Sequence, residues 1–390
     1  MSLKTKTKIL VTKMIWLCSR VFWVFPIEKN KVFFLSYNGK QYSDSPKYIS
    51  DYYLNRLDPP KIVWGFDKDF DLEKTRMDSR IITCKKGTFS YLYHLFSSKE
   101  IVINDFISTL FSLRPGQILI NTWHGGGTFK TIGMSRSKTF DYDPFFYKAH
   151  ADNTSAFSLS SEYFKETVVT RSFLFYGETV SCGMPRNAVL FQSNNHIKRK
   201  VREYFSIPNE TFIVLYAPTY RNYTASNSMD SDFEIIDFNR CRRSFERRFG
   251  RKVVILNRSH HIMHKSQSKG DCLEATNYPD MQELIIASDV LISDYSSCMW
   301  DYALTQKPIF VYAPDLHTYE ENIDFFMPAS EWAFSVSMNN DELEHNIIAF
   351  NEELYQRDLK AYMGPLRSYE CADSVEKICK WLDEKRKVNK

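Results

Sequence analysis

The sequence predicts an α/β protein made of parallel β-sheets whose faces are covered by helices. Short apolar runs of four to six residues alternate with segments of helical periodicity, as in β-α-β units. The chain has 390 residues, of which 43% are apolar, so two domains of ordinary size can each bury a core.

The first half of the chain is expected to supply one sheet. Helices are predicted at residues 45–56, where Pro46 suits the first helical position, and at residues 88–96. Residues 135–165 are rich in aromatic and polar side chains and form the least regular part of this half, either an acceptor-binding loop or a decorated surface. Strands are predicted at residues 31–36, 61–65, 80–83, 100–104 and 117–121.

The second half repeats the alternation and predicts a second sheet. The end of the chain, residues 354–390, is expected to be helical and is rich in lysine. The other expected elements are helices at 196–205, 237–249, 281–287 and 298–303, and strands at 212–216, 252–257, 290–292 and 308–312.

Residues 287–303 stand out in this half because a buried strand, a polar turn and a helix start follow one another. Ser296 and Ser297 lie in the turn, beside the free backbone N–H groups of the helix start. Such a turn suits a phosphate group. The alternative is that the two serines only cap the helix.

A second polar turn, residues 121–133, follows a predicted strand and contains His124 before three glycines, Gly125, Gly126 and Gly127. Glycines allow the backbone to approach a ligand closely, and open α/β sheets bind ligands at the carboxyl ends of their strands. The spacing is not that of a P-loop. His124 is therefore a candidate catalytic residue, with a purely structural histidine as the alternative.

The first thirty residues combine an apolar run with lysine and arginine. Lys13 and Arg20 interrupt the run, which makes it a poor transmembrane span, and no cleavage site for a signal peptide follows. On a helix, the polar and apolar side chains separate onto two sides. The pattern predicts an interfacial helix on an anionic membrane surface, with a helix packed on the protein's own core as the alternative.

Composition argues against several other classes of protein. The net charge of +4 is too small to indicate nucleic-acid binding, and the eight cysteines contain no CxxC pair, which indicates reduced thiols. His260, His261 and His264 form an HHxxH pattern, but a zinc site normally needs further ligands, so zinc is disfavoured. The arginines of residues 237–249 read as a solvated face, with an anionic contact as the alternative.

Six short segments, taken in order, resemble the CDP-glycerol glycerophosphotransferase family, which includes teichoic-acid primases and polymerases and related capsule polymerases. The segments are GKQYSDSPK (39–47), WHGGGTFKTIG (123–133), GMPRN (183–187), YAPTYR (216–221), RSH (258–260) and ISDYSSCMWDYA (292–303). The resemblance covers about residues 31–380. Three places depart from the family pattern: Gly126, Gly127 and Thr128 replace Thr-Pro-Leu, ECADS (370–374) replaces Asp-Gly-x-Ala-Ser, and His261 stands where tyrosine or proline is common. These departures bear on which polyol is taken.

The resemblance implies a GT-B architecture, in which two Rossmann-like domains face each other across a central cleft. It divides the chain into a membrane-association segment (1–30), an acceptor-side domain (31–190), a CDP-donor domain (191–370) and a C-terminal helix with a basic tail (371–390). It also implies peripheral attachment to the cytoplasmic face of the bacterial cell membrane, which agrees with the amphipathic start.

The resemblance further implies transfer of glycerol phosphate from CDP-glycerol to a hydroxyl of a membrane-linked teichoic acid or capsule acceptor, with release of CMP. CDP-ribitol as donor, a GT-B nucleotide-sugar glycosyltransferase and a non-catalytic scaffold are the alternatives. No metal is expected to be obligatory, and Mg²⁺ stays open. The expected catalytic residues are His124 and His260. The expected substrate-binding residues are Gly125, Gly126, Gly127, Thr128, Arg186, Pro218, Thr219, Arg221, Arg258, Ser259, Ser296, Ser297 and Asp301.

Overall fold

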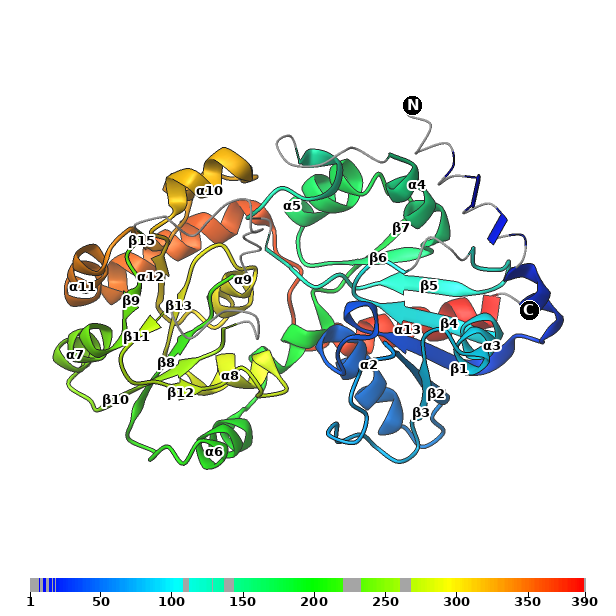
Figure 1. Ribbon diagram of the computed structural model, residues 1–390, viewed down its shortest axis with the longest axis horizontal. Coiled ribbons are helices and arrows are strands. Elements are labelled where there is room, and N and C mark those ends of the chain that lie inside the picture. Colours follow the sequence, from blue (N-terminus) through cyan, green and yellow to red (C-terminus); the bar gives the residue numbers. More distant parts are fainter. Residues whose placement is uncertain are drawn as a thin grey trace.

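The computed structural model describes residues 7, 10, 11, 14, 15, 17, 19–107, 112–127, 129–136, 144–219, 233–259 and 268–388. It contains two parallel sheets, each covered by helices, which form two lobes (Figure 1). The predicted α/β class with two parallel-sheet domains is therefore confirmed. The first lobe is built around strands β1 to β7, and the second lobe around strands β8, β10 and β12 to β15.

The sheet of the first lobe has the strand order β3-β2-β1-β4-β5-β6-β7, and every pairing is parallel. The predicted strands are present, although β3 begins two residues later than expected. Two strands, β6 and β7, fall in or beyond the segment predicted to be irregular. The strands are β1 (Glu28–Leu35), β2 (Lys61–Phe66), β3 (Ile82–Lys85), β4 (Ser98–Ile103), β5 (Ile118–Asn121), β6 (Ala156–Leu159) and β7 (Glu178–Ser181).

Helices cover both faces of this sheet because neighbouring residues of each strand point to opposite sides. On β1, Phe34 faces a cluster shared with α2 (Asp44–Leu54) and α13 (Ser374–Val388). The adjacent Phe33 faces a cluster shared with α3 (Phe89–Ser97). The lobe is completed by α4 (Pro144–Asn153), α5 (Glu162–Phe164), the π-helix Lys165–Ser172, and the short 3-10 helices Tyr37–Gly39, Gly133–Ser135 and Pro185–Phe191.

The sheet of the second lobe has the order β12-β10-β8-β13-β14-β15 and is also parallel. Its strands are β8 (Phe212–Tyr216), β10 (Val253–Asn257), β12 (Leu273–Glu274), β13 (Val290–Ser293), β14 (Ile309–Tyr312) and β15 (Ser335–Ser337); β9 (Ile236–Asp237) and β11 (Ser268–Lys269) form a separate pair. The strands and helices predicted for this half match closely, and two of the helices, α8 (Met281–Ala287) and α9 (Cys298–Ala303), begin and end as expected.

Helices again lie on both faces of this second sheet. One face packs on α6 (Asn195–Tyr204), α8, α9 and α12 (Glu352–Met363), and the other on α7 (Phe238–Phe249) and α11 (Asn340–Ile348). The helix α10 (Leu316–Asn322) and the 3-10 helix Ala329–Glu331 follow β14. On α7, Arg240 pairs with Asp341 and Glu344 of α11, whereas Arg243 is exposed, so the arginine helix is partly a packed face.

The end of the chain is helical, as predicted for residues 354–390, and consists of two helices in different lobes. A short 3-10 helix, Gly364–Leu366, breaks the run because glycine and proline do not continue a helix. After this break the chain crosses back, and Ile378, Cys379 and Leu382 of α13 join the core of the first lobe (Figure 1). The expected boundaries between the four segments remain predictions.

At the amino end, a 3-10 helix at Arg20–Val24 packs on α3 through Phe22, whose ring lies 5.7 Å from that of Phe89 and 5.8 Å from that of Phe96. Within the described residues, no helix is both long enough and apolar enough to cross a membrane.

Candidate active site at the junction of the two lobes

His124 lies where three strands of the first sheet end. The strand order reverses between β1 and β4, because β2 and β3 lie on one side of β1 and β4 to β7 lie on the other. Open α/β sheets bind ligands at such a switch point. The imidazole Nδ1 of His124 lies 2.6 Å from the backbone carbonyl oxygen of Asn104, directly after β4. Because a carbonyl can only accept, Nδ1 carries a proton, so in the neutral imidazole Nε2 is the lone-pair nitrogen, as a general base requires.

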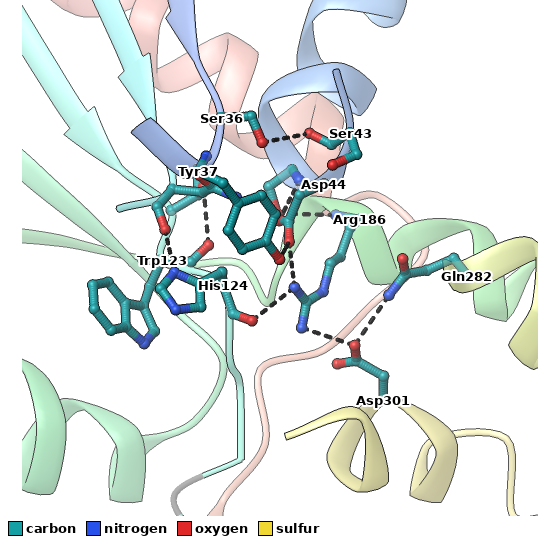
Figure 2. A network of polar contacts seen from close by, with 12 residues as sticks. Ser36, Tyr37, Ser43, Asp44, Trp123, His124, Arg186, Gln282 and Asp301 are labelled. Carbon is teal, nitrogen blue, oxygen red and sulfur yellow. Dashed lines mark hydrogen bonds and ion pairs between the residues drawn. The ribbon is translucent and has the colours of Figure 1, made fainter. Parts of the chain in front are cut away.

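Two aromatic rings hold the imidazole in place (Figure 2). The ring of Trp123 stacks on it with centroids 4.2 Å apart, and the ring of Tyr37 lies 5.3 Å away. The side chain of Asn104 accepts a hydrogen bond from the backbone N–H of Tyr37 at 2.8 Å. Asn104 therefore positions both the histidine, through its carbonyl, and the tyrosine, through its amide oxygen.

The backbone around His124 is strained. Trp123 has a φ of +54°, Tyr37 +44°, Asn38 +55° and Asp44 +64°, all in the left-handed region that non-glycine residues rarely adopt. Each such residue costs on the order of 1–3 kcal/mol, and such strain concentrates at functional sites. Two of the four, Tyr37 and Trp123, come from segments far apart in the sequence and pack on the same imidazole, which supports a functional role for this place.

Arg186 lies at the centre of a buried polar network beside the histidine (Figure 2). Its guanidinium contacts Asp44 at 2.5 Å, the backbone carbonyl of His124 at 2.9 Å, and Asp301 of α9 at 2.8 Å. Burial opposes its charge, but the carboxylates of Asp301 and Asp44 raise the pKa of Arg186 well above its ordinary value. Arg186 and Asp301, both expected on the donor, are thus brought together and bind each other.

The pKa values of the two carboxylates are shifted in opposite directions. Burial disfavours the charge of Asp44, yet Arg186 and the hydrogen bonds from Ser45 and Tyr37 hold its pKa below the ordinary value. For Asp301, burial dominates and raises the pKa, although Arg186 opposes the shift. The network therefore holds a firmly ionised carboxylate in the first lobe and a more readily protonated one in the second.

The second sheet has its own switch point between β8 and β13, and the predicted donor residues lie there. Pro218 and Thr219 follow β8, and Ser296 and Ser297 follow β13. The backbone N–H of Thr219 donates to Asp294 at 2.8 Å, which joins the two turns. In the part of the chain that the structure describes, the Ser297 side chain makes no cap hydrogen bond to α9, whereas the Ser296 hydroxyl accepts one from the backbone N–H of Cys298 at 3.4 Å. The capping alternative therefore applies to Ser296 and does not account for Ser297.

Arg258, directly after β10, is held by carbonyl oxygens. Its guanidinium donates to the carbonyl of Tyr278 at 2.6 Å, and burial lowers its pKa. The carbonyl of the neighbouring Ser259 accepts a hydrogen bond from Thr276. Because carbonyls do not neutralise a cation, the charge of Arg258 remains available to an anionic ligand.

The glycines after His124 press against α9 of the second lobe. A Cβ at Gly125 would lie 3.1 Å from the Cβ of Ser297, and a Cβ at Gly126 would lie 2.6 Å from Nε1 of Trp300. A Cβ at Gly127 would lie 2.6 Å from the Cβ of Trp300. The glycine run thus brings the backbone of His124 against the predicted donor helix.

Glu370 belongs to the ECADS segment (370–374), which also departs from the family pattern, and it contacts helix α9. Its carboxylate accepts from the indole N–H of Trp300 at 3.0 Å, the backbone N–H of Met184 at 2.9 Å and the amide of Asn187 at 3.1 Å. Burial raises the pKa of Glu370 to about 8. Trp300 therefore packs against Gly126 and Gly127 and also binds Glu370, so these glycines and the ECADS segment are connected through one side chain.

Sequence reasoning did not single out several residues of this network. Asp44 lies within the recognised GKQYSDSPK segment and Asn187 within GMPRN, so their motifs were a usable signal. Gln282 donates to Asp301 at 3.0 Å, but nothing in its local sequence indicates this. The residues missed are Tyr37, Asp44, Asn104, Asn187, Gln282 and Glu370.

Three predicted site residues, Thr128, Arg221 and His260, lie outside the described residues, as does the whole HHxxH pattern. Among the residues that are described, no group of three His, Cys, Asp or Glu side chains is arranged to hold a metal ion.

The chain thus has two parallel-sheet lobes, and the loop of His124 in one lobe packs against the start of helix α9 in the other. This arrangement, together with the family match that follows, places the protein in the class of two-domain α/β transferases. Residues 17–382 match the family described as CDP-Glycerol:Poly(glycerophosphate) glycerophosphotransferase, and the chain belongs to this family.

Curated relatives agree with this assignment. The teichoic acid poly(glycerol phosphate) polymerase of Bacillus subtilis (strain 168) is 25% identical over 314 residues, which are 77% of this chain but 41% of the relative. The teichoic acid glycerol-phosphate transferase of Staphylococcus aureus (strain NCTC 8325 / PS 47) is 25% identical over 310 residues, covering 76% of this chain and 77% of the relative. The chain thus spans about two fifths of the Bacillus subtilis polymerase.

Among solved structures, that of the wall teichoic acid polymerase TagF is similar, with a TM-score of 0.81 and 20% identity over 100% of this chain and 99% of that chain. At this identity the similarity establishes the fold.

Proposed function

We propose that this protein transfers glycerol phosphate from CDP-glycerol to a hydroxyl of a membrane-linked teichoic acid or capsule acceptor and releases CMP. One observation carries the proposal: the loop of His124 touches Ser297, so a base with an available Nε2 adjoins the turn expected to hold the donor. Family membership supports the donor class.

The proposed reaction is a single displacement at phosphorus. The acceptor hydroxyl oxygen forms a bond to the β-phosphorus of the donor, its proton passes to Nε2 of His124, and the bond to the CMP oxygen breaks. A hydroxyl is a weak nucleophile, and a positioned base typically contributes about 10²–10⁴-fold to such a step. CMP leaves as an anion, and the product is a phosphodiester.

The negative charge of the transferring group needs donors in fixed positions. Arg258 is proposed to supply one, because its guanidinium is held by the carbonyl of Tyr278 rather than by a carboxylate. Ser296 and Ser297 are proposed to donate hydrogen bonds from their hydroxyl groups to the phosphate. Pro218 and Thr219 are proposed to line the same site. His260 and Arg221 remain proposals from the family resemblance. No metal is proposed as obligatory, so chelation with EDTA should leave turnover unchanged.

The arrangement of the lobes is proposed to be of the GT-B type, with the acceptor on the first lobe and the donor on the second. We further propose attachment to the cytoplasmic face of the membrane. Leu10, Met14, Leu17, Val21 and Val24 follow a spacing of four and three residues and are between 59% and 78% exposed. Such an apolar stripe fits an interfacial helix.

Ribitol phosphate is the second candidate for the transferred group. The teichoic acid ribitol-phosphate polymerase TarK of Staphylococcus aureus (strain NCTC 8325 / PS 47) is 28% identical over 319 residues, covering 77% of this chain and 58% of the relative. This identity is no lower than that of the glycerol-phosphate relatives. The polyol must therefore be decided by experiment.

The test measures CMP release from CDP-glycerol and, separately, from CDP-ribitol, with purified protein and a detergent-solubilised lipid acceptor. CMP from CDP-glycerol supports the proposal, and CMP from CDP-ribitol alone moves the assignment to the second candidate. Release of UDP from a nucleotide sugar, without CMP from either donor, would overturn it in favour of a glycosyltransferase. Donor binding without turnover would favour a scaffold.

The role of His124 is tested with His124→Ala. Turnover should fall by about 10²–10⁴-fold, because the general base is lost. The dissociation constant of CDP-glycerol, measured by calorimetry, should remain unchanged. Near-normal turnover in this variant would remove His124 from the reaction.

A further inference from the structure

The two terminal nitrogens of Arg186 are engaged by groups of the protein itself. One terminal nitrogen, Nη1, donates to Asp44 and to the carbonyl of His124, and the other, Nη2, pairs with Asp301. The Nε atom is buried and has no partner among the described residues. The side chain is 6% exposed. Because so little of the side chain is exposed, a donor phosphate has little access to this guanidinium.

The carboxylate of Asp301 binds three side chains where the two lobes meet. Besides Arg186, it accepts from Asn187 at 2.9 Å and from Gln282 at 3.0 Å. It lies four residues after Ser297, which is about one helical turn, so α9 moves as a unit with it. Arg186 and Asn187 are neighbours in the first lobe, and together they fix the first turn of α9.

The same guanidinium reaches the reacting histidine. The Nη1 atom donates to the His124 carbonyl at 2.9 Å while it contacts Asp44, which anchors the group to α2 (Figure 2). A guanidinium is a rigid planar fork, so it can fix several partners relative to one another, whereas a lysine ammonium on a flexible stem cannot. Arg186 thus has direct contacts to the His124 loop and to the donor-side helix.

We infer that Arg186 is a positioning residue that sets the distance between His124 and the donor held by α9, and is not a clamp on the donor phosphate. This inference rests on the proposed function. A misplacement of about 1 Å at a reacting centre can cost about 100-fold in rate, because near-attack geometry is lost. The consequence is that damage to this link lowers the rate of the chemical step and leaves donor affinity unchanged.

The test compares Arg186→Lys and Asp301→Asn with the unmodified protein. Arg186→Lys keeps the positive charge, so the buried carboxylates retain a counter-ion, and Asp301→Asn keeps the shape of its side chain. In both variants kcat should fall about 10- to 100-fold, whereas the dissociation constant of CDP-glycerol from calorimetry should stay within about threefold. A phosphate clamp predicts the opposite for Asp301→Asn, because release of Arg186 would keep or improve donor affinity without loss of kcat.

A matched control is Arg386→Lys. Arg386 forms a bidentate pair with the buried Glu100, at 2.6 and 2.8 Å, near the start of β4 and remote from the carboxyl edge that carries His124. This substitution should lower the thermal midpoint but leave kcat unchanged. An equal loss of kcat in the control would show that the effect of Arg186→Lys is one of general stability, and would overturn the inference.

A second readout is independent of turnover. Hydrogen exchange of the backbone amides of residues 121–127 should become faster in Asp301→Asn, although the substitution lies in the other lobe. Unchanged exchange there, with unchanged kcat, would overturn the inference. If the unmodified protein binds CDP-glycerol but releases no CMP, the proposed function fails, and the exchange measurement still decides whether Arg186 links α9 to the His124 loop.

Discussion

A single methyl group added at Gly126 should disrupt the contact between the lobes. The new Cβ of Gly126→Ala would lie 2.6 Å from Nε1 and 2.7 Å from Cδ1 of Trp300, and 3.1 Å from the Cβ of Ser160. Side-chain Cβ atoms do not approach other heavy atoms so closely. The indole must therefore move, and its hydrogen bond to Glu370 must lengthen or break.

The magnitude follows from these two effects. Overpacking of a buried contact costs about 1–3 kcal/mol, and the lost hydrogen bond adds about 0.5–1.5 kcal/mol. For a lobe of this size, the sum of about 2–4 kcal/mol corresponds to a decrease of roughly 4–16 °C in the thermal midpoint. CMP release should fall as well, because the same loop carries His124.

The assay is a thermal melt followed by circular dichroism, with CMP release measured on the same samples. Gly364→Ala is the control, since a Cβ there meets no atom within 4 Å, and its midpoint should not change. Adding Trp300→Leu to Gly126→Ala should relieve the clash, so the double substitution should cost less than the sum of the two single ones. A midpoint for Gly126→Ala equal to that of the control would refute the close contact.

Three further predictions follow from the geometry. Ser296→Ala together with Ser297→Ala should weaken CDP-glycerol binding at least severalfold by calorimetry; unchanged affinity would leave these serines without a donor role. Because burial raises the pKa of Glu370 to about 8, its contribution to stability is fully present below the pKa of the unfolded chain and is lost as pH rises toward 8. The thermal midpoint should therefore fall between about pH 4.5 and 8 more steeply in the unmodified protein than in Glu370→Gln, and parallel curves would contradict this. Leu17→Glu with Val21→Glu should abolish co-flotation with anionic vesicles, and persistent flotation would exclude the exposed stripe as the contact.

The strands of the sheets could largely be predicted from the sequence because a strand buried on both faces is a short apolar run. The exceptions have physical causes. Strand β6 is only four residues long and lies between segments rich in aromatic residues, so its apolar run does not stand out in the sequence. Strand β15, Ser335–Ser337, contains two serines and is not an apolar run. Its exposure pattern, with one buried serine, depends on its neighbour β14 and not on its own composition.

The candidate site was predictable only in part. Position at a strand end indicated His124, and the strand-turn-helix pattern indicated Ser297. The interlobe network was not predictable, because Asp44 and Arg186 are 142 residues apart and an arginine in a turn looks the same whether it binds a phosphate or two carboxylates. Recognising the family assigned Arg186 to the donor, but the role of a buried side chain depends on its partners in space.

The return of α13 to the first lobe has a consequence for how the protein folds. The ribosome completes the whole second lobe before it makes Ile378 and Leu382, yet these residues fill the core beside β1. The core of the first lobe therefore lacks these side chains during most of translation, although α2, made early, already contributes to the same cluster. The two lobes are also joined by two chain crossings, before α6 and after α12, so any movement of one lobe against the other must involve both connections.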